Sequence, residues 1–420
     1  MEETQMITEN NIKIFKMPNV FYNPAQKLNR DLSIAVINEF IKDIKEPKIF
    51  EAMSATGLRG IRYKKELIND AKIYLNDLDS ESIKLIEKNI ILNELNPTDF
   101  YITNEDCNKY MASNPSTFDV IDIDPFGCCT PFINTALLAI KNNGLLCLTS
   151  TDMGVLCNNK AKCYLKYGSA IYKTPACHEL AIRTLLSCLS REASKYNICI
   201  DPLISVSVDF YIRIFVKVTK KISKALTVSL TNSNYLFCGC FNIKEIKILT
   251  KFDKIKNTYL EVQKCDICNK KFAFCGPFWN KAIHNGTFAS SLNKSLEKSD
   301  DLRLIGILRL IEFELNEFLY YCIPSISSYK KLPCIPMDKL LNALFNLGYD
   351  VSFTHCKFNS IKTNAPLKIL YEIIEHFHGK NNETIYSFKE NSKTLEMLSR
   401  NYYRKLCHSS MGPLSKPQHI

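Results

Sequence analysis

The stretch KIFEAMSATGLR, residues 48–59, runs from a short apolar segment into a turn of small residues and then into a helical pattern. Ser54, Ala55, Thr56 and Gly57 are small enough for the backbone to turn tightly and to approach a ligand. The turn lacks the GxGxxG spacing, which disfavours dinucleotide binding. Taken alone, it is equally typical of an ordinary strand-to-helix turn, so its interpretation depends on the strands around it.

The same alternation of strand and helix continues between residues 17 and 218. Further apolar runs are KIYLND from Lys72, FYITNED from Phe100, DVIDIDP from Asp119 and GLLCLTSTD from Gly144, and helical patterns separate them. Such alternation indicates a parallel sheet covered by helices. The segment PLISVSVDFYIRIFVKV from Pro202 is rich in β-branched and aromatic residues, which predicts the later strands of the same sheet.

After Lys217 the composition changes to dense lysine, scattered asparagine and cysteine-rich stretches. We therefore predict an α/β fold, with a Rossmann-like domain and a mainly parallel sheet over residues 1–225. A smaller α+β domain is expected over residues 226–420, where residues 301–325 and 366–376 have amphipathic helical patterns. A chain of 420 residues is long enough to build two such cores.

The formal net charge of +11 favours a polyanionic partner, although a general excess of lysine would give the same surplus. The 18 cysteines would suggest disulfides in a secreted protein. However, the N-terminal run MEETQMITENNIKIF has no apolar signal core, and no apolar run is long enough to span a bilayer. We expect an intracellular protein with reduced thiols that is neither secreted nor inserted in a membrane.

Acidic residues follow the second and third predicted strands. The second strand ends in Asn76-Asp77, where a carboxylate can accept hydrogen bonds from both hydroxyls of a ribose. The third ends in Asn104-Glu105-Asp106-Cys107, where a carboxylate can accept a bond from an adenine amino group. Each acid alone could be a solvated turn residue or a helix cap. Together with the small-residue turn, they indicate an adenosine site.

The fourth strand ends in Asp122-Ile-Asp124-Pro125-Phe126-Gly127. An exocyclic amine on a purine is a poor nucleophile because its lone pair is delocalised into the ring. The Asp124 carboxylate and the Pro125 carbonyl can each accept one N–H bond and so aim that lone pair at a methyl donor, while the Phe126 ring stacks on the base. The carboxylate also stabilises the positive charge that develops on nitrogen. The alternative is a structural loop in which Asp124 caps a helix and Phe126 packs in the core.

The chain resembles the tRNA guanine-26 N2-dimethyltransferase family along nearly its whole length and in the same order. The matching stretches are VFYNPAQKLNRDLSIAVI from Val20, SATGLRGIRY from Ser54, LNDLDSESIKLIEKN from Leu75, DVIDIDPFG from Asp119, GLLCLTSTDMGVLC from Gly144, KYGSAIYKTPACHELAIR from Lys166, PLISVSVDFYIRIFVKV from Pro202, CGPFWNKAIHN from Cys275 and VSFTHCKFNSIKTNAPL from Val351. The resemblance implies a class I methyltransferase domain. It further implies an enzyme that transfers one or two methyl groups from S-adenosylmethionine to N2 of guanine 26 in tRNA.

The resemblance also implies which residues hold the cofactor. Arg30 in NRD and Arg59 in SATGLR look like ligands of its methionine end, and Asp77 looks like the ribose ligand. Asp106 and Cys107 look like neighbours of the adenine. Without the family match, the two arginines could equally form surface salt bridges.

For the substrate, the resemblance implies that Phe21 and Phe126 form two aromatic walls with the target guanine between them. His355 and Lys362 lie in a matching motif and are expected to contact tRNA. Runs of lysine at 217–224, 244–256 and 264–271, with Lys330 and Lys331, suggest a surface that follows the phosphates, although most single lysines would only be solvated.

A structural zinc site is a further expectation, since a CxxC pair can combine with a CxC pair into a tetrahedral set of thiolates. The CxC pair is shorter than the knuckle that relatives often carry, and chance pairs also arise in a chain rich in cysteine. The four expected ligands are Cys238, Cys240, Cys265 and Cys268.

Two other functions stay open at this point. One is an amino-methyltransferase that acts on rRNA or DNA, and the other is a catalytically silent RNA-binding protein. We expect tRNA as the partner, with no membrane and no obligate protein partner, and the nucleus in preference to the cytoplasm. The number of methyl groups transferred and the oligomeric state are left open by the sequence.

Overall fold

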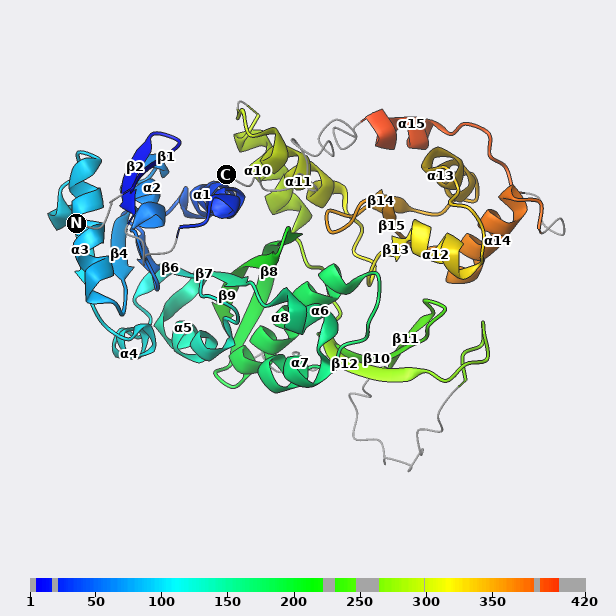
Figure 1. Ribbon diagram of the computed structural model, residues 1–420, viewed down its shortest axis with the longest axis horizontal. Helices are drawn as coiled ribbons and strands as arrows, with labels where there is room; N and C mark the ends of the chain where they lie inside the picture. The colour runs from blue at the N-terminus through cyan, green and yellow to red at the C-terminus, as the bar shows by residue number, and fades with distance from the viewer. Residues whose placement is uncertain are drawn as a thin grey trace.

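A computed structural model describes residues 5–16, 22–221, 231–246, 264–297, 299–380 and 386–399. Figure 1 shows a large α/β body, a small sheet projecting from it, and a separate cluster of helices with the C-terminal strands. A seven-stranded sheet forms the centre of the large body, in the order β5-β4-β3-β6-β7-β9-β8. The strands from β5 to β7 run parallel, whereas β9 is antiparallel to both β7 and β8.

The strands of this sheet follow the predicted apolar runs. Their bounds are β3 (Lys48–Glu51), β4 (Lys72–Asn76), β5 (Phe100–Thr103), β6 (Phe118–Ile123), β7 (Ile140–Ser150), β8 (Ile198–Val208) and β9 (Tyr211–Lys220). Helix α1 (Lys27–Ile41) precedes the first of these strands, and the helices between them are α2 (Leu58–Glu66), α3 (Ser80–Leu92), α4 (Cys107–Ser113), α5 (Ile133–Ala139), α6 (Met153–Asn158), α7 (Lys160–Tyr167) and α8 (Cys177–Ser194).

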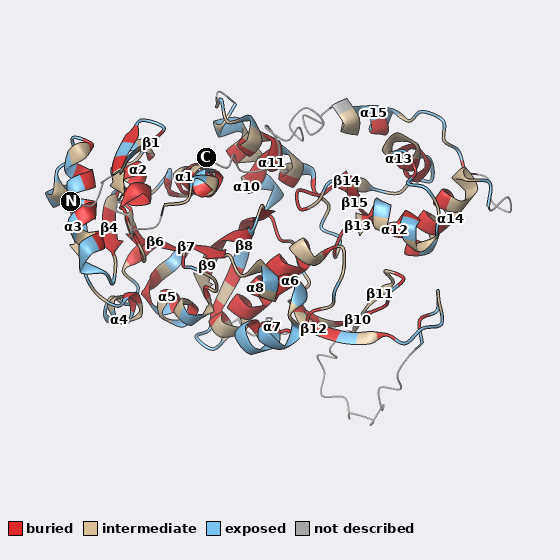
Figure 2. Cartoon of the chain, in the orientation of Figure 1, coloured by how far each residue is buried: buried red, intermediate tan, exposed pale blue. Residues whose placement is uncertain are grey.

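Two hydrophobic cores lie on the two faces of the sheet. Successive residues of a strand point to opposite faces, so Ile49 belongs to one core and Phe50 to the other, and Val120 and Ile121 divide in the same way. Helices α1, α2 and α3 contribute to the first core, and α5, α6 and α8 to the second. Figure 2 shows the central strands and α8 largely in the colour of buried residues. A sheet covered on both faces explains why its strands are nearly continuously apolar.

The remaining elements surround this body. A hairpin of β1 (Gln5–Glu9) and β2 (Ile12–Lys16) packs against α3, and β10 (Asn232–Phe237), β11 (Ile243–Ile246) and β12 (Ala273–Trp279) form a three-stranded sheet. Helices α10 (Gly286–Ser295) and α11 (Leu302–Phe313) return to α1. The C-terminal elements are β13 (Tyr321–Cys322), α12 (Ile323–Tyr329), α13 (Met337–Asn346), β14 (Val351–Phe353), β15 (Ser360–Thr363), α14 (Leu367–Phe377) and α15 (Ser392–Ser399).

The predicted fold class is confirmed, with a mainly parallel α/β sheet followed by a smaller α+β part. The C-terminal part has its own core, which extends from Ile323 to Tyr386. Most of the buried apolar side chains between 235 and 322 join the two cores of the large body instead, and Cys238, Cys240, Cys265 and Phe272 form a small cluster of their own. The division of the chain at residue 225 stays a prediction. Among the described helices, none is long and apolar enough to cross a membrane.

Gly60 of α2 packs so closely on the sheet that any larger residue should destabilise the fold. A Cβ at this position would lie 2.2 Å from Cδ2 of the buried Leu75 and 3.0 Å from Oε2 of Glu51. We expect Gly60→Ala to lower the free energy of unfolding by about 1–3 kcal/mol in urea titrations, despite the higher helix propensity of alanine.

Gly154→Ala in α6 is the matched control, because a Cβ there meets no atom within 4 Å. This variant should be at least as stable as the wild type. Equal stability of the two alanine variants would contradict the close packing inferred at Gly60.

Candidate active site

Three of the four predicted strand ends, those of β3, β4 and β6, meet around one cavity of about 560 Å³. Its size falls within the range of small-molecule and cofactor sites. The residues that line it come from the segment before α1, from α1 and α2, from the carboxyl ends of β3, β4, β6 and β7, and from the turn between β8 and β9. They are Tyr22, Asn23, Gln26, Arg30, Glu51, Met53, Ser54, Ala55, Thr56, Leu58, Arg59, Asp77, Leu78, Asp124, Pro125, Phe126, Thr151 and Phe210.

The small-residue turn and Asp77 are bonded to each other at one end of this cavity. Ala55 and Gly57 both have left-handed backbone, with φ of 47° and 75°. Ala55 donates its backbone N–H to Asp77 Oδ2 at 2.8 Å, and Asp79 donates to Asp77 Oδ1 at 3.0 Å. The turn and the carboxylate are thereby fixed side by side, as a ribose site at adjacent strand ends requires.

The next strand end lies beside this one but outside the cavity lining. Asp106 is exposed and caps α4 by accepting the Lys109 N–H at 3.0 Å. Cys107 is buried, and this burial raises the pKa of its thiol to about 11. The Asn76 amide donates to the carbonyls of Ala52 and Glu105, which joins three strand ends. The adenine roles of Asp106 and Cys107 stay predictions.

Asp124, Pro125 and Phe126 form the loop that follows β6. Gly127 closes this loop with left-handed backbone at φ 80°, donates its N–H to Thr151 Oγ1 at 2.8 Å and accepts the Thr151 N–H at 2.8 Å. The clamp to Thr151 presents Phe126, whose side chain is 74% exposed, at the edge of the cavity. The ring therefore does not fill the core, and its stacking on a base stays a prediction.

Arg59 links this loop to the buried network beneath it. Its guanidinium bonds the Asp124 carboxylate, donates to Ser33 Oγ at 3.1 Å and lies 3.5 Å from the Asp122 carboxylate. Burial alone would lower the pKa of Arg59, but the two carboxylates outweigh it and hold the pKa well above its ordinary value. Arg59 thus lines the cavity as a permanent cation.

Arg30 also lines the cavity, but its guanidinium is already paired. It donates to Glu9 Oε1 at 2.8 Å and to the Asn23 carbonyl at 3.2 Å, and it lies 5.4 Å from the centroid of the Tyr22 ring. Arg62 shares the Glu9 carboxylate at 2.8 Å. The sequence analysis missed Glu9, because only the tertiary fold brings the β1–β2 hairpin against α1. Phe21, the predicted second wall of the base site, lies outside the described residues.

The structure corrects the prediction that His355 and Lys362 contact tRNA. Both are buried, and Lys362 Nζ lies 3.0 Å from a carboxylate oxygen of Glu179 and 3.0 Å from one of Glu314. His355 Nδ1 lies 2.7 Å from Glu314, and its Nε2 accepts the backbone N–H of Ser207 at 3.3 Å. These charges face one another inside the protein, so the motif joins the C-terminal part to α8 and β8 instead of meeting RNA.

Three ligand-type side chains meet in that network, yet their hydrogen bonds oppose metal binding. His284 Nδ1 accepts the Ser205 N–H at 3.3 Å, just as His355 accepts the Ser207 N–H. Each ring therefore carries its proton on the nitrogen nearer Glu314, which is the nitrogen that a metal would need. The cluster is explained as a polar network.

The four predicted zinc ligands do come together. Cys238 and Cys268 have their sulfurs 3.3 Å apart, and the sulfurs of Cys240 and Cys265 are 3.5 Å apart. All four lie within 4.8 Å of one another. Two knuckles, one after β10 and one before β12, supply two thiols each, which is the donor set of a closed structural site.

Glu51 is a further cavity residue that the sequence analysis did not assign. It ends β3, and one carboxylate oxygen is buried without a hydrogen-bond partner. Burial raises its pKa from an ordinary 4.5 to about 8, against the attraction of Arg59 and with help from Asp122. Glu51 is therefore protonated at neutral pH.

This shift predicts a pH dependence of stability. The unfolded chain loses the Glu51 proton near pH 4.5 and the folded chain only near pH 8, so the wild type loses stability as pH rises between these values. Glu51→Gln has no proton to lose at this position. The free energy of unfolding of Glu51→Gln relative to that of the wild type should therefore increase with rising pH, by at most about 1.4 kcal/mol per pH unit. Urea titrations at pH 5, 6, 7 and 8 measure the difference. The control is Glu87→Gln, a change of an exposed side chain, whose free energy of unfolding should change with pH as that of the wild type does. If Glu51→Gln also followed the pH dependence of the wild type, the raised pKa of Glu51 would be refuted.

Known proteins resemble this chain over most of its length. A family model described as N2,N2-dimethylguanosine tRNA methyltransferase matches residues 2–375. The tRNA (guanine(26)-N(2))-dimethyltransferase of Drosophila melanogaster is 32% identical over 435 residues, covering 88% of this chain and 75% of the relative. The enzyme of the same name from Methanobrevibacter smithii is 34% identical over 380 residues, covering 88% of this chain and 94% of the relative. The enzyme from Saccharomyces cerevisiae whose name adds "mitochondrial" is 30% identical, covering 89% of this chain and 79% of the relative.

Among solved structures, Trm1 from Pyrococcus horikoshii in complex with S-adenosyl-L-methionine superposes with a TM-score of 0.75. It is 28% identical, and the match covers 88% of this chain and 99% of that one. The structural similarity thus extends over most of both chains. Together with the family match, it shows that the chain belongs to the N2,N2-dimethylguanosine tRNA methyltransferase family.

Proposed function

We propose that this protein transfers one or two methyl groups from S-adenosylmethionine to the exocyclic N2 of guanine 26 in tRNA. The observation that carries the proposal is the position of Asp124 and Phe126 on the same cavity as Asp77 and Arg59. A site for an amine and a site for an adenosine are thereby adjacent. The names of the relatives support guanine 26 of tRNA as the target.

The cavity residues fit the cofactor by chemistry and size. Asp77 accepts hydrogen bonds and would hold the ribose, and Arg59 and Arg30 are the cations that would face the carboxylate of the methionine end. When bound, the cofactor supplies an electrophilic methyl group on a sulfonium. Glu51, as a neutral acid beside Arg59, adds no charge that would repel that carboxylate.

The loop after β6 would hold the amine. Arg59 bonds Oδ2 of Asp124, which leaves Oδ1 to accept one N–H of the guanine amino group. The Pro125 carbonyl accepts the second N–H, and proline fixes its own φ so that the loop is preorganised. Phe126 stacks on the base once it leaves its helix. Asp124 then stabilises the positive charge that forms on nitrogen and accepts the proton released.

Replacement of Asp124 tests this mechanism. We expect Asp124→Asn to lower the single-turnover rate of methyl transfer by roughly 10³-fold, because an amide can neither balance the cationic nitrogen nor accept its proton. The rate is measured with radiolabelled cofactor on separate tRNA, rRNA and DNA pools, and methylated guanosine is identified by nucleoside mass spectrometry.

The control is Asp99→Asn, an exposed acid outside the cavity, which should keep full activity. Cofactor binding by calorimetry verifies that the Asp124→Asn protein is folded. Unchanged methyl transfer by Asp124→Asn would refute the mechanism. Label in rRNA or DNA and none in tRNA would refute the substrate.

We also propose that Cys238, Cys240, Cys265 and Cys268 hold one structural Zn²⁺, which would fix the two knuckles without taking part in catalysis. Four converging sulfurs on short loops support this site. Metal analysis should find about one zinc per chain, and Cys265→Ser should lose the zinc and several degrees of melting temperature. Cys199→Ser, a thiol outside the cluster, is the control and should keep both. Wild-type protein without metal after purification in zinc would contradict the proposal.

For tRNA binding, exposed lysines beside the knuckles support a phosphate-contacting surface: Lys264, Lys270 and Lys271. Of the other predicted runs, residues 222–224 and 247–256 lie outside the described residues. Lys330 is engaged with Glu375 at 2.6 Å. The nuclear location also stays a proposal, since the yeast relative is named mitochondrial.

A further inference from the structure

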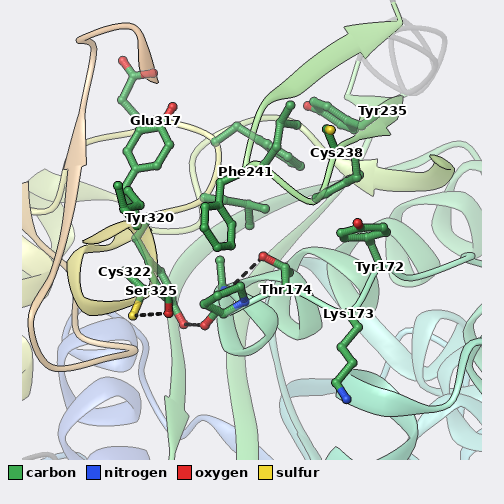
Figure 3. Close-up of a pocket in the computed structure, with 18 of the residues that line it drawn as sticks. Tyr172, Lys173, Thr174, Tyr235, Cys238, Phe241, Glu317, Tyr320, Cys322 and Ser325 are labelled. Atoms are coloured by element: carbon green, nitrogen blue, oxygen red, sulfur yellow. Dashed lines mark hydrogen bonds between the residues drawn. The ribbon is translucent and has the colours of Figure 1, made fainter. Parts of the chain in front are cut away.

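A second cavity, of about 410 Å³, lies where three parts of the protein meet. One wall is the loop between α7 and α8, another is the β10–β11 hairpin with its knuckle, and the third is the segment from α11 to α12. Figure 3 shows Tyr172 and Tyr235 on one side of this space, Tyr320 and Glu317 on the other, and Phe241 between them. No residue that lines the cofactor cavity lines this one.

Aromatic rings make up much of the wall and are held rigidly. Tyr235 stacks on Phe318 with centroids 3.8 Å apart and planes 6° apart, and Tyr172 stacks on Phe237 at 5.2 Å. The Tyr320 hydroxyl donates to the Pro175 carbonyl at 2.9 Å, which ties the third wall to the first. Tyr172 remains only half-buried, so part of its ring faces the cavity. Rings of this kind are the platforms on which proteins stack unpaired bases.

Two of the polar groups that line the cavity are exposed carboxylates, those of Glu245 and Glu317. Oε1 of Glu245 already accepts from Ser233 and Asn280, and Asn316 adds an amide oxygen. Carboxylates repel phosphate, so in a chain with a net charge of +11 this site is not built for the RNA backbone. Carboxylates instead accept hydrogen bonds from the N–H groups on the edge of a base. Lys173, which is also exposed, could bind the phosphate attached to that nucleotide.

We propose that this cavity binds a second unstacked nucleotide of the tRNA, with a base that presents N–H donors, guanine above all. Its rings would stack on the base, and its carboxylates would accept from the Watson–Crick edge. The occupied cavity would join the catalytic body, the knuckle sheet and the C-terminal part on one RNA. The inference rests on the proposed function, because it takes tRNA as the substrate.

The test fills the cavity without touching the catalytic loop. Ser325 of α12 is half-buried and lines the cavity, and Ser325→Trp would project an indole into it. We expect this variant to bind unmodified tRNA transcript about tenfold more weakly in filter-binding assays, since it loses one stacked base. The single-turnover methylation rate at saturating tRNA and the calorimetric affinity for S-adenosylmethionine should stay within about twofold of the wild type.

Ser325→Ala is the matched control and should bind tRNA as the wild type does. Glu317→Gln changes an exposed side chain, so its effect does not depend on whether the fold accommodates a tryptophan at position 325. This variant should bind tRNA several-fold more weakly than the wild type. In saturation-transfer NMR, guanosine 5′-monophosphate should give stronger signals than uridine 5′-monophosphate with the wild type, and Ser325→Trp should reduce the difference, since only the proposed guanine site beside Asp124 then remains.

Wild-type affinity for tRNA in both Ser325→Trp and Glu317→Gln would overturn the inference, and so would equal signals from the two nucleotides. Failure of the proposed function can be distinguished from this outcome, because the wild-type protein itself would then leave tRNA unmethylated.

Discussion

A buried ion pair between Asp122 of β6 and Arg213 of β9 holds the centre of the protein together. Two hydrogen bonds of 2.7 and 2.9 Å join them, Tyr63 of α2 bonds the same carboxylate, and Arg59 approaches it to 3.5 Å. Burial would raise the pKa of Asp122, but the two arginines outweigh it and lower the pKa. Loss of one partner would leave a charge buried without compensation, which typically costs about 3–5 kcal/mol. The pair fixes the strand from which the catalytic loop departs.

A second buried network fixes the C-terminal part. Lys362 bridges Glu179 of α8 and Glu314 at the end of α11, while Arg183 bonds Glu179 and the carbonyls of Trp279, Lys281 and Glu317. One cation of the C-terminal part thus pairs with two acids of the large body. Since Arg183 also holds the backbone at Glu317, the same network supports a wall of the second cavity. Buried charges therefore hold the junction between the two parts in addition to its apolar contacts.

The sequence analysis found the residues whose positions follow from local rules. Asp77 and Asp124 stand at strand ends, and the carboxyl ends of parallel strands converge, so their meeting at one cavity could be predicted. The position of Glu9 beside Arg30 could not be predicted, because no local rule brings the β1–β2 hairpin to α1. The roles of His355 and Lys362 were wrong for the same reason: a polar motif does not reveal acidic partners far away in the chain. The amphipathic pattern of 301–325 similarly concealed the end of α11 at Phe313, after which the chain lines the second cavity.

The charges around the catalytic loop balance only if Glu51 stays neutral. Arg59 and Arg213 supply two positive charges, and Asp122 and Asp124 supply two negative ones. An ionised Glu51, 3.9 Å from Arg59, would be a third carboxylate competing for the guanidinium that orients Asp124. Burial prevents this competition by keeping the Glu51 proton in place. Arg59 therefore remains paired with one oxygen of Asp124, and in the proposed mechanism the other oxygen is left to accept an N–H of the guanine amine. The proposed capture of the amine by Asp124 thus depends on Glu51, an acid that forms no bond to the amine itself.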